Sequence, residues 1–140
     1  MTELSAAAEL VGAFVRTLNP DTGADRLADR RGLAEFLRER GLASGPIPIS
    51  VSHHTEALDL RAGLRAQLHR GAGRRVDPAD LDRGARALDG LRISARLEPA
   101  GEPPLVLAPA VVDELRRCLA VIAAAWATVV ISGEWRSIEF

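Results

Sequence analysis

The chain contains no lysine and no tyrosine, and only one cysteine, Cys118, among its 140 residues. Without lysine there is no side-chain amine for Schiff-base chemistry. A single cysteine cannot form an internal disulfide, and it excludes zinc sites built from several cysteines. Cys118 lies in an apolar segment, which favours a packed thiol over a reactive one. This cysteine usage is typical of the reducing cytoplasm, where we expect the protein to reside.

The sequence also lacks the short motifs of common active sites. It contains no HExxH or CxxC metal pattern and no GxSxG turn, and the glycines Gly71 and Gly73 lack the lysine and serine of a phosphate loop. His53, His54 and Glu56 are the best candidates for metal ligands, but they fit exposed polar residues just before a helix better. We therefore expect no catalytic residues, no bound metal and no cofactor.

The charge pattern gives no sign of a nucleic acid or a membrane as partner. Eighteen arginines are offset by 19 acidic residues, so the formal net charge is −1. The one basic cluster, Arg70, Arg74 and Arg75, is followed by aspartates and has no interleaved aromatics, which indicates a solvated loop. The N-terminus has no signal-peptide pattern. The apolar run 118–131 is shorter than the roughly 20 residues that span a bilayer, so it predicts a buried helix.

Apolar residues recur at helical spacing along most of the chain. They predict helices over residues 5–18, 31–40 and 55–69, and Asp77-Pro78 marks the start of another helix by a cap and a proline at the first helical position. Residues 44–52 differ, because Pro46 and Pro48 restrict them to an edge strand or an extended connector.

In the last third of the sequence the spacing of the apolar residues changes. Leu91, Ile93, Ala95 and Leu97 alternate with polar residues, which predicts a strand with one buried face, and residues 105–107 form the returning strand. A long helix then follows over about 109–132, apolar nearly all round in its second half and therefore central or at a subunit contact. Its expected inward stripe comprises Val111, Val112, Leu115, Leu119, Ile122, Trp126, Val129 and Val130.

These elements predict a single domain over residues 1–140. The fold class is α+β and mostly α, with four to five helices and a small antiparallel β-hairpin at about 91–108. We expect the hairpin to pack on the long C-terminal helix at about 109–132.

Arg61 and Arg65 are the polar residues that the pattern singles out. They lie one helical turn apart, beside an apolar stripe of Leu60, Leu64 and Leu68. A half-buried guanidinium needs a carboxylate or carbonyl partner, because an unpaired buried charge is costly. An internal salt bridge to an acidic side chain is the simpler interpretation, and contact with a ligand is the alternative.

Several short stretches, taken in order, resemble a known family. They are Phe14–Pro20, Asp25–Asp29, Leu33–Leu37, Leu58–Arg65, the Leu91–Leu97 strand, and the closing helix with Gly133-Glu134-Trp135-Arg136. Together they cover nearly the whole chain, and they resemble the ABATE domain. That domain is the N-terminal part of bacterial stress-induced transcription regulators of the CGNR zinc-finger family.

The resemblance implies a non-catalytic sensing or interaction domain of a transcription regulator. The family's C-terminal zinc finger, which is thought to bind DNA, would begin just past Phe140, so we expect this chain to lack it. The positions that the resemblance marks for a ligand are Thr17, Arg61, Arg65 and Trp135. The chain departs from the family by carrying Arg16 in place of an asparagine and Ala62 in place of a glutamate.

The resemblance also implies the partners. We expect a small-molecule effector and a homodimer, and neither direct nucleic-acid binding nor membrane attachment by this chain. A free-standing small-molecule-binding or accessory protein is the first alternative function. A metal-dependent enzyme is the second, and it would require a metal near His53, His54 and Glu56.

Overall fold

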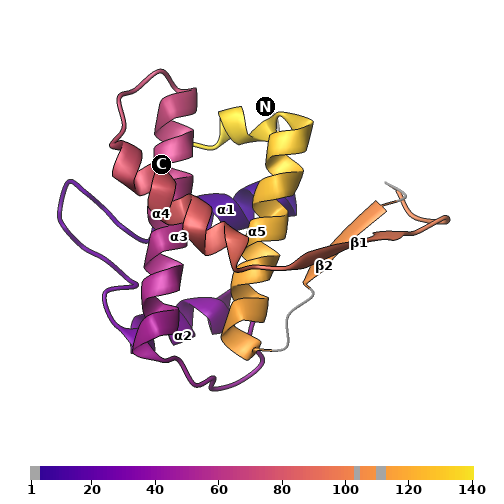
Figure 1. Ribbon diagram of the computed structural model, residues 1–140, viewed down its shortest axis with the longest axis horizontal. Coiled ribbons are helices and arrows are strands. Elements are labelled where there is room, and N and C mark those ends of the chain that lie inside the picture. The colour runs from indigo at the N-terminus through magenta and orange to yellow at the C-terminus, as the bar shows by residue number, and fades with distance from the viewer. Residues whose placement is uncertain (1–3, 103–104, 110–112) are drawn as a thin grey trace.

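The structure, a computed structural model, describes residues 4–102, 105–109 and 113–140. Within them the predicted fold class is confirmed, because helices dominate and the two strands form one antiparallel hairpin (Figure 1). The elements are α1 (Ala6–Val15), α2 (Arg30–Glu39), α3 (Val51–Gly71), α4 (Pro78–Asp89), β1 (Ile93–Leu97), β2 (Leu105–Pro109), α5 (Glu114–Ser132) and the short 3-10 helix η1 (Glu134–Ser137). Residues 44–50 form a connector without regular secondary structure, so the predicted segment 44–52 is not a strand, and its last two residues belong to α3.

Side-chain caps set where the helices begin. Asp77 caps α4 and Pro78 takes its first position, as predicted. Ser50 caps α3, which therefore begins before the expected Thr55 and places His53 and His54 inside its first turn. Their predicted place before the helix is therefore wrong.

The last helix also begins at a cap. The Asp113 carboxylate accepts a hydrogen bond from the Arg116 amide, so α5 begins at Glu114 rather than near residue 109. Pro109 instead ends β2. Two residues of the expected inward stripe, Val111 and Val112, lie outside the described residues.

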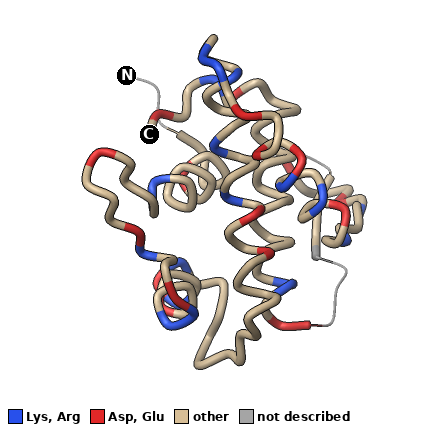
Figure 2. The backbone as a smooth tube through the Cα atoms, turned by 60° about the vertical axis from the view of Figure 1, so that its left-hand side comes forward, with Lys and Arg blue, Asp and Glu red and all other residues tan. Residues whose placement is uncertain are grey.

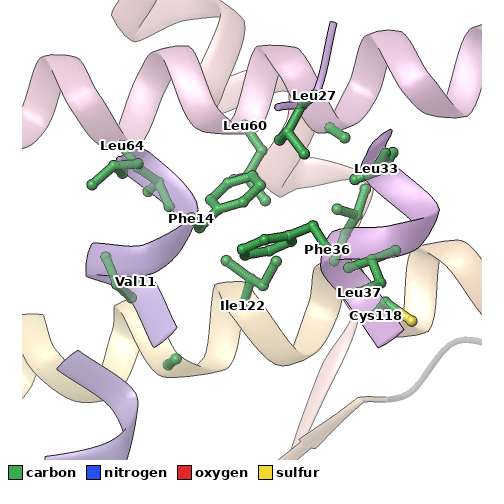
Figure 3. Packing of buried hydrophobic residues seen from close by; sticks show 14 of the residues in the cluster. Val11, Phe14, Leu27, Leu33, Phe36, Leu37, Leu60, Leu64, Cys118 and Ile122 are labelled. Atoms are coloured by element: carbon green, nitrogen blue, oxygen red, sulfur yellow. The ribbon is translucent and has the colours of Figure 1, made fainter. Parts of the chain in front are cut away.

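One apolar core lies between α1, α2, α3 and α5 (Figure 3). Phe14 of α1 and Phe36 of α2 meet at its centre, with ring centroids 6.1 Å apart. Cys118 of α5 is buried, and its thiol donates a hydrogen bond to the Leu42 carbonyl oxygen at 3.3 Å. Burial raises the pKa of that thiol, which confirms Cys118 as a packing residue.

The middle of α5, from Cys118 to Ala125, is buried on nearly every side, and the helix becomes exposed toward its end. Leu115, Leu119, Ile122 and Val129 are buried as expected, but Val130 is 41% exposed and does not belong to the inward stripe. The neighbouring Ile131 is 81% exposed. By length and composition α5 is apolar enough to cross a membrane, yet half of that apolar window is buried inside the fold, as in a core helix.

The hairpin projects away from the helices, although its base contacts α5 (Figure 1). Ala95 pairs with Leu107, and Leu97 with Leu105, so these side chains share one face as the alternation predicted. That face is not buried, however, and Leu97 is 79% exposed. The prediction that one face of this strand is buried is therefore wrong, because the hairpin extends beyond the helices that would cover it.

Two glycines let α3 and α4 cross at close range. A Cβ atom added to Gly63 of α3 would collide with the backbone of Gly84 on α4, and the reverse substitution would do the same. Both glycines are buried. This crossing fixes the loop between the two helices, residues 72–77, against the last turns of α3.

We predict that Gly63→Ala destabilises the protein by about 2 kcal/mol, since the new methyl group forces two backbones apart. Urea unfolding followed by circular dichroism measures this change. Gly45→Ala is the matched control, because a Cβ atom there meets nothing within 4 Å. Equal unfolding midpoints for the two variants would contradict the close crossing.

Candidate functional site

The segment between α1 and α2 folds back on itself. Leu18 and Asp25 form an isolated antiparallel bridge, and the Arg26 amide donates to the Thr17 carbonyl oxygen at 2.9 Å. Gly23 turns the chain at the tip with a φ of 76°. The turn brings the side chains of Thr17 and Asp25 to the side of the segment that faces α3.

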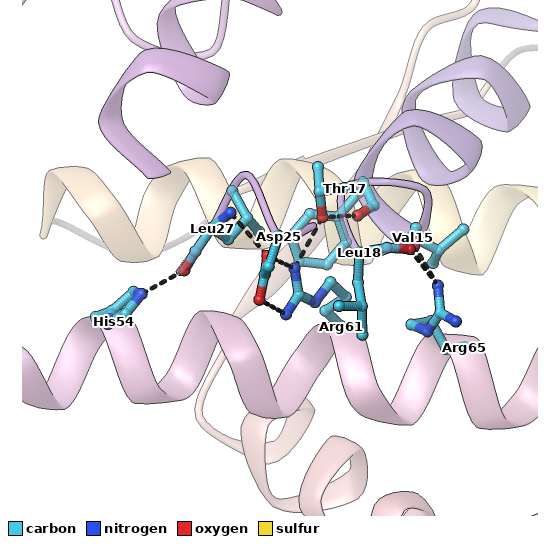
Figure 4. Close-up of polar contacts among 9 residues, drawn as sticks. Val15, Thr17, Leu18, Asp25, Leu27, His54, Arg61 and Arg65 are labelled. Carbon is cyan, nitrogen blue, oxygen red and sulfur yellow. Dashed lines mark hydrogen bonds and ion pairs between the residues drawn. The ribbon is translucent and has the colours of Figure 1, made fainter. Parts of the chain in front are cut away.

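One face of α3 holds this segment along its length (Figure 4). His54, Arg61 and Arg65 lie seven and then four residues apart, which places them on one side of the helix. The His54 Nε2 atom lies 2.7 Å from the Leu27 carbonyl oxygen, and because a carbonyl can only accept, the imidazole is the donor. Three side chains on one face of α3 thus bind the connection between α1 and α2.

Arg61 is the centre of this contact. Its Nη1 and Nη2 atoms donate to the two carboxylate oxygens of Asp25 at 2.6 and 2.8 Å, and Nη1 also donates to Thr17 Oγ1 at 3.0 Å. Arg61 is 6% exposed and Thr17 only 5%. The hydrogen bonds from Arg61 are the main cause that holds the pKa of the Asp25 carboxyl below its usual value. The expected salt bridge is therefore confirmed, with Asp25 as the acidic partner.

Arg65 has a different environment. Its Nη1 atom donates to the carbonyl oxygens of Val15 and Leu18 at 2.6 and 3.3 Å. Its guanidinium lies over the ring of Phe140, 5.0 Å from the centroid. Partial burial, and secondly the charge of Arg61, lower the pKa of Arg65. Among the described residues no carboxylate forms an ion pair with it.

His69, one turn beyond Arg65, completes this face of the helix. Its Nδ1 atom lies 3.2 Å from Nη1 of Arg74, which can only donate, so the imidazole proton resides on Nε2. Burial first, and then the charges of Arg65 and Arg74, lower the pKa of His69. The Phe140 ring packs against the imidazole with a centroid distance of 4.5 Å.

Arg65 and His69 form a wall shared by two adjoining hollows, which we call together the Arg65 cleft. The first hollow has a volume of about 440 Å³ and lies between α3 and the segment from Arg75 to Arg83. Leu58, Ala62, Ala66 and Val76 give it an apolar lining, and Arg61 lies at its edge. The second hollow, of about 420 Å³, lies under the turn at residues 18–21 and also contacts Arg16, Arg74 and Phe140.

The four residues marked by the family resemblance do not form one group. Thr17 and Arg61 bind each other, and Arg65 opens onto the cleft, but Trp135 lies elsewhere. It packs on Gly71 and forms an edge contact with Trp126 at a centroid distance of 6.0 Å. A separate, smaller hollow lies beside it, lined by Gln67, Trp126 and Val130.

The three metal candidates also point to different partners. Glu56 pairs with Arg116 at 2.6 Å, and His53 lies 3.9 Å from the Asp113 carboxylate. His54 is engaged with the Leu27 carbonyl oxygen. In the described part of the chain no three His, Cys, Asp or Glu side chains are grouped so that they could hold a metal ion.

Sequence reasoning missed Asp25 and His69 as parts of this site. Asp25 stands 36 residues before Arg61, so no local spacing joins them, although its stretch belonged to the family resemblance. His69 falls four residues after Arg65, and this helical spacing was the available signal.

We predict that Asp25→Asn destabilises the protein by about 3 kcal/mol, because it leaves the buried Arg61 cation without its counter-charge. Arg61→Met should cost less, since the orphaned Asp25 carboxylate is more exposed and keeps the Leu27 amide as a donor. Urea unfolding of both single variants and the double variant measures the coupling, which we expect to exceed about 1 kcal/mol. Additive losses would show that the pair contributes nothing to stability.

Comparison with known proteins identifies the family. Residues 4–133 match the family model of ABATE, described as "putative stress-induced transcription regulator". Comparisons with curated proteins and with solved structures give no match. Because the family match spans nearly the whole chain, it confirms the expected resemblance, and this protein belongs to the ABATE family.

Proposed function

We propose that this chain is a non-catalytic sensing module of a transcription regulator and that the Arg65 cleft receives its small-molecule effector. The family match supports a regulatory role. The observation that carries the site is Arg65, a half-buried cation that has no carboxylate partner in the described part of the chain. It lies at the wall between two hollows of about 440 and 420 Å³. Ligand pockets of this size, with an apolar lining and a few polar groups, suit small metabolites.

In this proposal the polar residues have separate roles. Arg65 and His69 contact the effector, because both line the two hollows. Thr17 and Arg61 position the turn above the cleft through Asp25. An effector that binds the Arg65 guanidinium would change the strength of the hydrogen bond from Arg65 to the carbonyl oxygen of Val15, the last residue of α1. Occupancy of the cleft is thereby coupled to the packing of α1.

The test is an amide NMR screen of a library of small metabolites. We expect at least one compound to give saturable shifts at Leu18, Arg65 and His69, and Arg65→Met to abolish them. Arg117→Met is the matched control, because Arg117 is an exposed arginine on α5, outside the cleft lining. A library without any such compound, or shifts that survive Arg65→Met, would overturn the effector site.

We also predict that residues 1–140 do not bind duplex DNA at physiological salt. The net charge is −1, and basic and acidic residues alternate over the fold (Figure 2). Affinity for DNA depends on many simultaneous phosphate contacts, which such a surface does not provide. Fluorescence anisotropy with a labelled duplex measures this, and tight binding that resists added salt would contradict it.

A further inference from the structure

The arginines of this chain differ in how their charge is balanced. Of the eighteen, all of which are described, four are buried or half-buried: Arg61, Arg65, Arg83 and Arg116. Asp25, Asp59 and Glu56 lie within 2.6–2.8 Å of Arg61, Arg83 and Arg116 respectively. Within the described residues, the partners of the Arg65 guanidinium are instead two carbonyl oxygens and an aromatic ring. Carbonyls satisfy donors but do not neutralise a cation. Within the described residues no carboxylate is paired with Arg65, and the charge of Asp25, which is paired with Arg61, compensates it only in part.

The second hollow has an excess of such cations. Among the described side chains that line it, three are arginines and one is acidic: Arg16, Arg65 and Arg74, and Asp21. Each of these three guanidinium groups makes its described hydrogen bonds through Nη1 alone, to Glu139, to Val15 and Leu18, and to His69 respectively. Within the described residues their Nη2 and Nε atoms have no acceptor. A guanidinium carries five N–H donors, so the fork that binds carboxylate or phosphate remains unoccupied in each.

The electrostatic effects on the neighbouring groups agree with this geometry. The charges of Arg65 and Arg74 both lower the pKa of His69, in addition to its burial. Burial first, and then the charge of Arg61, lower the pKa of Arg65, whereas the charge of Asp25 raises it. An anion between these groups would remove part of this repulsion and favour the charged forms.

Resting on the effector site proposed above, we propose that the ligand carries a carboxylate or phosphate group, bound between Arg65 and Arg74 in the second hollow. The remainder of the ligand extends past His69 into the first hollow, where Leu58, Ala62 and Val76 offer apolar surface. The anionic group supplies to Arg65 the counter-charge that Asp25 supplies to Arg61.

The test uses four small probes at constant ionic strength. Acetate and sulfate carry the two anionic chemistries, and acetamide and dimethyl sulfone are their neutral analogues. Amide NMR follows Leu18, His69 and Arg74, and imidazole NMR follows the titration of His69. We expect saturable shifts with at least one anion, no shifts with its neutral analogue, and a higher pKa of His69 in the bound state. Comparison of acetate with sulfate distinguishes a carboxylate ligand from a phosphate ligand.

Two substitutions test the role of Arg65. Arg65→Met should weaken anion binding about tenfold or more, the loss expected for hydrogen bonds to a charged group. Ala62→Glu leaves every arginine in place but puts a carboxylate three residues before Arg65, on the same helix face and beside the first hollow, which Arg65 also lines. It should also weaken the binding of acetate and sulfate about tenfold. Ala62→Gln has the same shape without the charge, so it measures the effect of side-chain size alone and should weaken binding less than Ala62→Glu does.

Each outcome decides between the two proposals. Neutral probes that bind as well as the anions, or anion shifts spread equally over exposed arginines such as Arg117, would overturn the anionic class. So would an absence of shifts with both anions. The effector site would still stand in these cases if a neutral compound from the metabolite library shifted Leu18, Arg65 and His69. A failure of that library screen would instead overturn the effector site itself.

Discussion

The ion pair between Arg61 and Asp25 is the constraint from which the rest of the site follows. A guanidinium at 6% exposure requires a carboxylate, and the acid comes from the segment between α1 and α2. That segment must therefore fold back so that Asp25 reaches α3. Thr17 then meets the same guanidinium, and the turn from Leu18 to Asp25 is fixed above the helix.

The same arrangement leaves Arg65 without a carboxylate partner in the described part of the chain. Arg61 and Arg65 lie one turn apart and face the same segment, but both oxygens of Asp25 are engaged by Arg61. Arg65 reaches the carbonyl end of α1 instead, where the partial negative charge of the helix terminus offers weak compensation. The different environments of Arg61 and Arg65 are thus a consequence of two cations on neighbouring turns that face a single carboxylate, Asp25, among the described residues.

The close crossing of α3 and α4 provides the opposite wall. Because Gly63 and Gly84 allow the backbones to touch, the loop after α3 lies directly beside Arg65 and His69. Larger residues at the crossing would move that loop outward and widen the first hollow. The volume available to a ligand is therefore set by two glycines that line little of it themselves.

Local patterns in the sequence predicted the helices well, because caps and periodicity are local. Asp77-Pro78 marked a helix start correctly, and the spacing of the apolar residues anticipated a mostly helical fold with one antiparallel hairpin. The alternation around Leu97 correctly placed its apolar side chains on one face, but alternation does not tell whether another element covers that face.

Pairings between distant segments could not be predicted in the same way. Helical spacing showed that Arg61 needed a partner, yet the choice of Asp25 depends on a turn 36 residues away. The spacing also treated Arg61 and Arg65 as equivalent. They differ because, among the described residues, it is the Asp25 carboxylate that reaches this face of α3 and pairs with Arg61. Arg65, which does not receive it, is the arginine to which we assign the proposed anion.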